Sequence, residues 1–128
     1  MADPISKRVL IVDDNADAAD MLAILLRTAG HHVEVAYSGP SAVAVALTQR
    51  PHVIFLDIAM PRMDGLKVAR QLREKPETQA ALIVAVTGFG RDDDRERTQQ
   101  AGFDFHLVKP VEPKQILELL GRRSGDEA

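Results

Sequence analysis

The sequence contains no cysteine, which excludes a disulfide framework, a thiolate metal site and a cysteine nucleophile. It has no run of about 18 apolar residues, the length that a membrane-spanning helix requires. Near the N-terminus, the basic pair at residues 7–8 is not followed by an apolar stretch long enough for a signal peptide. We therefore expect a soluble, cytoplasmic protein that does not enter a membrane.

An excess of positive charge is also missing. The 128 residues carry 16 basic and 19 acidic side chains, and the formal net charge is −3. Nucleic-acid binders normally show a basic stripe, so this balance argues against a nucleic-acid partner. The length corresponds to one domain with a real core. We expect a single domain over residues 1–128, with a core at about 7–120 and frayed ends at 1–6 and 121–128.

Short apolar segments alternate with helical patterns along the chain. Each segment is too short for a helix and ends in turn residues, which is typical of a strand buried on both faces of a parallel sheet. The five segments lie at 9–12, 33–36, 53–56 and 82–86 and within 103–108. Strands that alternate with helices in this way form βαβ units with right-handed crossovers. The pattern predicts an α/β fold with a doubly wound, five-stranded parallel sheet.

Three finer predictions concern the first helix and the histidines. Apolar spacing predicts that one side of the first helix faces the core, formed by Ala18, Leu22, Leu25, Leu26 and Ala29. The same helix should end at Gly30, because glycine is favoured just after a helix. His31, His32 and His52 lack the spacing of a metal site, and we expect them at the surface.

Polar side chains stand where four of the strands end. Asp13 and Asp14 follow the first strand, Asp57 ends the third, Thr87 ends the fourth, and Lys109 follows the fifth. Open parallel sheets bind ligands at these carboxyl ends, and this placement favours the strand order 2-1-3-4-5 of flavodoxin-like folds. Three converging carboxylates repel one another unless a cation lies among them, and a few carboxylates plus water suit Mg²⁺. The threonine hydroxyl and the lysine charge would suit a phosphoryl group on Asp57, since a carboxylate can act as the nucleophile.

Each of these positions also has an ordinary structural explanation. Asp and Asn are favoured helix N-caps, so one residue of Asp13, Asp14 and Asn15 should cap the first helix. Thr87 could be a turn hydroxyl and Lys109 a solvated surface lysine. Chance placement of all of them at four strand ends on one side of a sheet is much less expected, which favours the functional interpretation.

Four motifs resemble the receiver domains of two-component response regulators, and together they cover nearly the whole chain: IVDDN at 11–15, LDIAMPRMDG at 56–65, VTG at 86–88 and LVKP at 107–110. The resemblance implies a phosphoacceptor switch. Asp57 would take a phosphoryl group from a phosphohistidine on a sensor histidine kinase or a histidine phosphotransfer protein. The protein would catalyse only its own phosphorylation and dephosphorylation, as a monomer or weak homodimer. The sequence segments that contain Thr87 and Lys109 also resemble those of receivers attached to hybrid sensor kinases.

The resemblance also assigns roles to individual residues. Asp14, Asp57 and the backbone carbonyl of Ala59 would ligate Mg²⁺, and Asp13 would act mainly through metal-bound water. Thr87 would move toward the phosphoryl oxygen, and Lys109 would pair with it. The bond from Lys109 to the proline that follows is expected to be cis.

One position departs from the family. The switch residue three positions before the lysine is usually Tyr or Phe, but here it is His106. A histidine ring can rotate in a similar way, although it is smaller and can carry charge, and its movement would be coupled to that of Thr87. The alternative interpretation is an exposed histidine at the edge of the sheet.

Three competing functions fit the sequence less well. A phosphatase of the haloacid dehalogenase type needs a second aspartate two residues after the nucleophile, where this chain has Ala59. A flavin-binding protein of similar topology needs a phosphate-cradling loop after the first strand, and Asp13 and Asp14 have the wrong charge for it. A receiver-like interaction module that is never phosphorylated tends to lose an acidic or lysine position, and this chain keeps them all.

Overall fold

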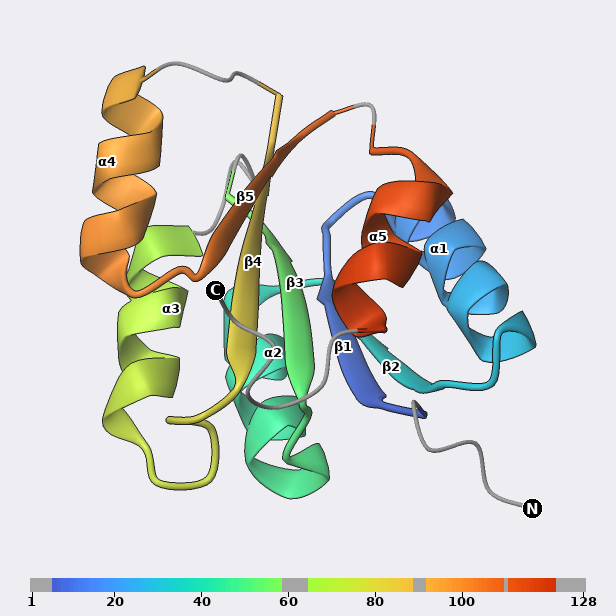
Figure 1. Cartoon of the computed structure of the whole chain (residues 1–128). Coiled ribbons are helices and arrows are strands. Elements are labelled where there is room, and N and C mark those ends of the chain that lie inside the picture. Colours follow the sequence, from blue (N-terminus) through green and yellow to red (C-terminus); the bar gives the residue numbers. More distant parts are fainter. Residues whose placement is uncertain (1–5, 59–64, 89–91, 110, 122–128) are drawn as a thin grey trace.

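The computed structural model describes residues 6–58, 65–88, 92–109 and 111–121 (Figure 1), and the side chains of helix residues 92–95 are not among the parts described. The ends that we expected to fray lie almost wholly outside these ranges. Within them, every helix is too short or too polar to cross a membrane.

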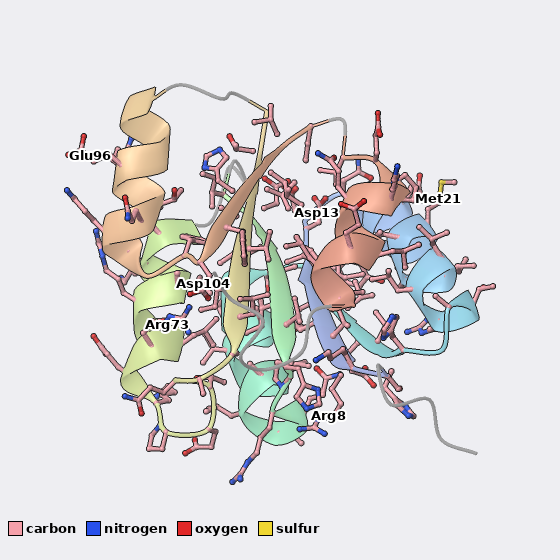
Figure 2. All side chains as sticks on the ribbon, viewed as in Figure 1. Arg8, Asp13, Met21, Arg73, Glu96 and Asp104 are labelled. Atoms are coloured by element: carbon pink, nitrogen blue, oxygen red, sulfur yellow. The ribbon has the colours of Figure 1, made fainter. Side chains whose placement is uncertain are left out.

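Five parallel strands form one sheet in the order β2-β1-β3-β4-β5, so the predicted fold and strand order are confirmed. The strands are β1 (Arg8–Val12), β2 (His32–Ala36), β3 (Val53–Asp57), β4 (Leu82–Thr87) and β5 (Phe105–Val108). The helices are α1 (Ala16–Thr28), α2 (Gly39–Gln49), α3 (Gly65–Glu74), α4 (Asp92–Ala101) and α5 (Pro113–Leu120). Helices α1 and α5 cover one face of the sheet, and α2, α3 and α4 cover the other (Figures 1 and 2).

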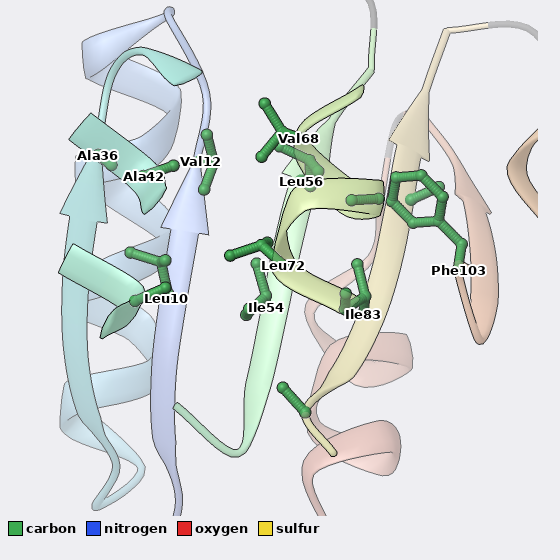
Figure 3. Close-up of a cluster of buried hydrophobic side chains, with 14 of the residues drawn as sticks. Leu10, Val12, Ala36, Ala42, Ile54, Leu56, Val68, Leu72, Ile83 and Phe103 are labelled. Carbon is green, nitrogen blue, oxygen red and sulfur yellow. The ribbon is translucent and has the colours of Figure 1, made fainter. Parts of the chain in front are cut away.

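The central strand β3 is buried along its whole length. Ile54 and Leu56 point into the core layer under α2 and α3 (Figure 3), and Val53 and Phe55 point into the layer under α1 and α5. A continuous apolar run is what burial on both faces of a parallel sheet requires. Asp57 is therefore the last residue of the most enclosed strand in the protein.

The strand register aligns the carboxyl ends of four strands. Val12 lies opposite Leu56, Asp57 opposite Val86, and Thr87 opposite Val108. Residues that directly follow β1, β3, β4 and β5 therefore emerge along one edge of the sheet, as the sequence predicted.

The inward side of α1 was predicted correctly only in part, since Leu26 is buried and Leu22 packs against the core as expected. The buried residues are Ala19, Ala23 and Leu26, whereas Ala18 and Ala29 are exposed. Apolar residues occupy more than one side of this helix, so their period does not define which side packs against the sheet. The predicted end is confirmed, because Gly30 follows the helix with a φ of 100° that favours glycine.

The prediction that His31, His32 and His52 lie at the surface was wrong for His31. His32 and His52 are exposed, but His31 is buried, with 8% of its surface accessible. Its Nδ1 accepts a hydrogen bond of 3.0 Å from the backbone N–H of Lys7, which leads into β1. Local sequence could not indicate this contact, because the two residues are 24 positions apart.

Arg73 lies in the last turn of α3 (Figure 2). It joins segments on the amino-terminal side of the strands, away from the carboxyl ends described above. Its guanidinium donates four hydrogen bonds, to the carbonyl oxygens of Gly102 (2.8 Å), Gln79 (2.9 Å) and Ala81 (2.6 Å) and to the Asp104 carboxylate (2.6 Å). Asp104 also accepts the backbone N–H of Ile83, the second residue of β4. One side chain thus connects α3 with the segments that enter β4 and β5.

Candidate functional site

Three carboxylates meet at the edge of the sheet where the strands end. Oxygen atoms of Asp13, Asp14 and Asp57 all lie within 4.8 Å of one another. Asp57 is only 5% exposed, Asp13 is half-buried and Asp14 is exposed. The cluster therefore has a buried end at Asp57 and an open side at Asp14.

The turn after β1 fixes Asp13 without using it as a helix cap. Asn15 is the N-cap of α1, and its side-chain oxygen accepts the N–H of Ala18 at 3.1 Å. The Asp13 carboxylate in turn accepts the N–H of Asn15 at 2.9 Å. Asn15 thus performs the capping that we expected of one residue in this turn.

Lys109 contributes the positive charge of the site. Its Nζ lies 2.8 Å from Asp57 Oδ2 and 3.9 Å from Asp13 Oδ2. Its backbone N–H donates to the carbonyl oxygen of Thr87 at 2.7 Å, which holds the ends of β4 and β5 together. Burial alone would lower the pKa of Lys109, but the hydrogen bond to Asp57 and the nearby carboxylates outweigh it and raise the pKa above 10.5. Lys109 is therefore a permanent cation at neutral pH.

The acidic charge is only partly balanced by that lysine. Burial is the main cause that raises the pKa of Asp13 above its usual 3.8, and repulsion by the Asp57 carboxylate adds to it. The Asn15 N–H and Lys109 act in the opposite direction. Three oxygen donors with one open side and an uncompensated negative charge fit a hard divalent cation that retains bound water, such as Mg²⁺.

Thr87 ends β4 and is buried, with 3% of its surface exposed. It comes directly after Val86, the residue opposite Asp57, so two neighbouring strands bring Thr87 and Asp57 to the same end of the sheet. His106 lies in β5 and is half-buried, which differs from the exposed strand-edge histidine of the alternative interpretation. The ring contacts Thr98 of α4, with 3.3 Å between Nδ1 and Oγ1.

Sequence reasoning did not identify Thr98. The only available signal was its spacing: Thr98 and Ala101 are three residues apart in α4, and both are buried. Two predictions, the metal-ligating carbonyl of Ala59 and the cis bond after Lys109, involve residues that lie outside the described parts of the chain.

The comparisons with known proteins agree with this geometry. The family model for the response regulator receiver domain matches residues 9–121. Protein PilH of Pseudomonas aeruginosa is 34% identical over 113 residues, which cover 88% of this chain and 93% of PilH. The structure of chemotaxis protein CheY4 of Vibrio cholerae has a TM-score of 0.85 and 30% identity, over 90% of this chain and 96% of that one.

A further similar structure contains a metal. It is the receiver domain of sensor histidine kinase PA1611 from Pseudomonas aeruginosa, in which a magnesium ion is coordinated in the active-site cleft. The TM-score is 0.81 and the identity 30%, over 90% of this chain and 94% of that one. With this sheet order, these strand-end residues and a family match over most of its length, the chain belongs to the receiver domains of two-component response regulators.

Proposed function

We propose that this receiver domain is a phosphorylation switch in which Asp57 accepts a phosphoryl group from a phosphohistidine. The observation that carries the proposal is the position of Asp57, which ends a fully buried strand and pairs with Lys109 Nζ at 2.8 Å. The strand fixes the carboxylate in place, and the cation beside it is suited to a phosphoryl oxygen. Phosphoryl transfer depends mainly on such positioning and charge neutralisation.

In the proposed transfer, an Asp57 carboxylate oxygen forms a bond to phosphorus while the phosphorus–nitrogen bond of the donor breaks. The electron pair of that bond stays on the imidazole nitrogen of the donor. Lys109 then pairs with an oxygen of the transferred group, and the Thr87 hydroxyl donates to another. In a separate dephosphorylation step, water attacks phosphorus, the bond to the Asp57 oxygen breaks with its electron pair returning to the carboxylate, and inorganic phosphate leaves while the proton from the water passes to solvent. The protein acts on its own side chain and not on an external substrate.

Asp13, Asp14 and Asp57 would hold Mg²⁺, together with the carbonyl of Ala59 that the family resemblance implies. Bound Mg²⁺ would supply further neutralisation of the negative charge that collects at the site. Support comes from the uncompensated acidic cluster and from the magnesium in the similar PA1611 receiver domain.

The donor in this proposal is a sensor histidine kinase or a histidine phosphotransfer protein. We further propose a cytoplasmic protein that is a monomer or a weak homodimer. Membership of the receiver family and the acceptor site at Asp57 support this choice of donor.

Intact mass spectrometry tests the proposal directly. The protein is incubated with acetyl phosphate, with and without Mg²⁺, beside Asp57→Asn and the control Asp17→Asn, which changes an exposed acid in the first turn of α1. We expect a Mg²⁺-dependent gain of one phosphoryl group in the wild type and in Asp17→Asn, and none in Asp57→Asn. A wild type that gains nothing would instead support an interaction module that is never phosphorylated.

A further inference from the structure

The contact between His106 and Thr98 joins the edge strand of the sheet to helix α4. The ring Nδ1 of His106 and the hydroxyl oxygen of Thr98 are 3.3 Å apart. Thr98 is almost completely buried, at 2% exposed, and the second ring nitrogen of His106, Nε2, is also buried. The imidazole therefore faces inward, between β5 and α4, with its Nε2 withdrawn from solvent.

The register of the sheet places this ring on the same face as Thr87. His106 lies opposite Ala85, and Val108 lies opposite Thr87. Residues that lie directly opposite each other on neighbouring strands point to the same face of the sheet. Residues two positions apart on one strand also share a face. Ala85 belongs to the core layer that also contains Ala101 of α4. Thr87 and the ring thus share the side of the sheet that α4 covers, with only the small side chain of Ala85 opposite the ring.

A phenyl ring can be held in such a place by packing alone, but imidazole has different requirements. It is smaller, and its two nitrogen atoms need hydrogen-bond partners when they leave water. A threonine hydroxyl can donate to a bare Nδ1 or accept from a protonated one, so Thr98 serves either tautomer of His106. Removing that hydroxyl would leave a methyl group against a ring nitrogen and would favour rotation of the ring toward solvent.

We propose that Thr98 is a positioning residue that holds the His106 ring inward and so sets the fraction of unphosphorylated protein that already has the inward ring. The functional part of this inference rests on the proposed phosphorylation switch. If phosphorylation of Asp57 favours the inward ring, then Thr98 supports the same state in advance. Loss of the hydroxyl should then reduce the competent population before any phosphoryl group arrives.

The first experiment measures ring exposure without phosphorylation. Diethylpyrocarbonate modifies accessible histidines, and mass spectrometry reads the rate at each one in the wild type, Thr98→Val and Thr98→Ser. We expect Thr98→Val to raise the rate at His106 about two- to tenfold, the equilibrium equivalent of one net hydrogen bond. The serine variant should stay near the wild type, and the exposed His32 and His52 should not change in any protein.

An unchanged rate at His106 in Thr98→Val, or a parallel rise at all histidines, would overturn the inference. A second measurement applies even if the valine variant does not fold. Nuclear Overhauser spectra of the wild type should connect the ring protons of His106 with the side chain of Thr98, whereas ring protons without such contacts would contradict a held ring.

A functional measurement completes the test. Initial rates of phosphorylation by acetyl phosphate should fall in Thr98→Val, by a smaller factor than the rise in His106 modification because most rings still face inward, and should recover in Thr98→Ser. If the wild type is not phosphorylated, the proposed function fails, while the exposure measurement still decides the position of the ring. If the wild type is phosphorylated and Thr98→Val reacts equally fast, the role of Thr98 is refuted and the switch remains.

Discussion

Replacement of Arg73 by methionine tests how much the fold depends on one side chain far from the acidic cluster. Methionine keeps an unbranched apolar stem, although it is shorter than arginine, and it removes all four hydrogen bonds of the guanidinium. The carbonyl oxygens of Gly102 and Ala81 are partly buried, so water can replace the lost donor only in part. The Gln79 carbonyl and the Asp104 carboxylate are better exposed and can be hydrated.

The magnitude follows from these four contacts. The two partly buried hydrogen bonds should be worth about 1–1.5 kcal/mol each. The ion pair with Asp104 has side chains that are 23% and 40% exposed, so solvent screening limits it, with the Gln79 contact, to about 1 kcal/mol in all. The total is about 3–4 kcal/mol. With an unfolding entropy of about 2.1 cal/mol/K per residue, a chain of 128 residues should lose roughly 11–15 °C in Tm.

Urea unfolding and differential scanning calorimetry measure this loss. The matched control is Arg70→Met, which removes an exposed arginine one turn earlier in the same helix. The control should change the free energy of unfolding by less than about 0.5 kcal/mol. A decrease below about 1 kcal/mol for Arg73→Met, or one no larger than the control, would refute the assignment of Arg73 as a connection between these segments.

Two further predictions concern ions. At ten times its Kd, Mg²⁺ should raise the free energy of unfolding of the wild type by about 1.4 kcal/mol. Asp13→Asn should be more stable than the wild type without Mg²⁺, because it removes a repelling carboxylate, and should gain less from the ion; equal gains by calorimetry would exclude Asp13 from the metal site. Burial lowers the pKa of His52 below 6.5, and the charges of Arg8 and Lys7 add to this, so the unfolded chain takes up the proton first. Stability should therefore fall as the pH drops below about 6.5, and the His52 contribution should be absent in His52→Asn; identical urea midpoints from pH 7.5 to 5.5 in the wild type would contradict it.

The parts of the molecule that sequence could predict are those governed by strand ends. A parallel sheet brings its carboxyl ends to one edge, so the positions of Asp13, Asp57 and Thr87 after apolar runs were sufficient to place them together. The same reasoning predicted the strand order. These conclusions required only period, length and the residue that ends each strand.

Contacts between distant segments could not be predicted in this way. His31 is buried because a backbone N–H from the segment before β1 reaches it, and Arg73 is a central contact because two remote turns approach α3. The pairing of Thr98 with His106 depends on how α4 lies across β5. In each case the contacting residue belongs to another element, and the local sequence pattern does not indicate that the two elements come into contact.

The burial of the strands differs from the centre of the sheet to its edge. All five residues of β3 are buried, whereas all four residues of β5 are only half-buried. A strand with less packing around it can be displaced more easily, so we expect β5 to move more readily than β3. A new charge on Asp57 would then shift β3 little, and the larger displacement should occur at β5. Signals from this site should leave the molecule through its edge, whatever partner receives them.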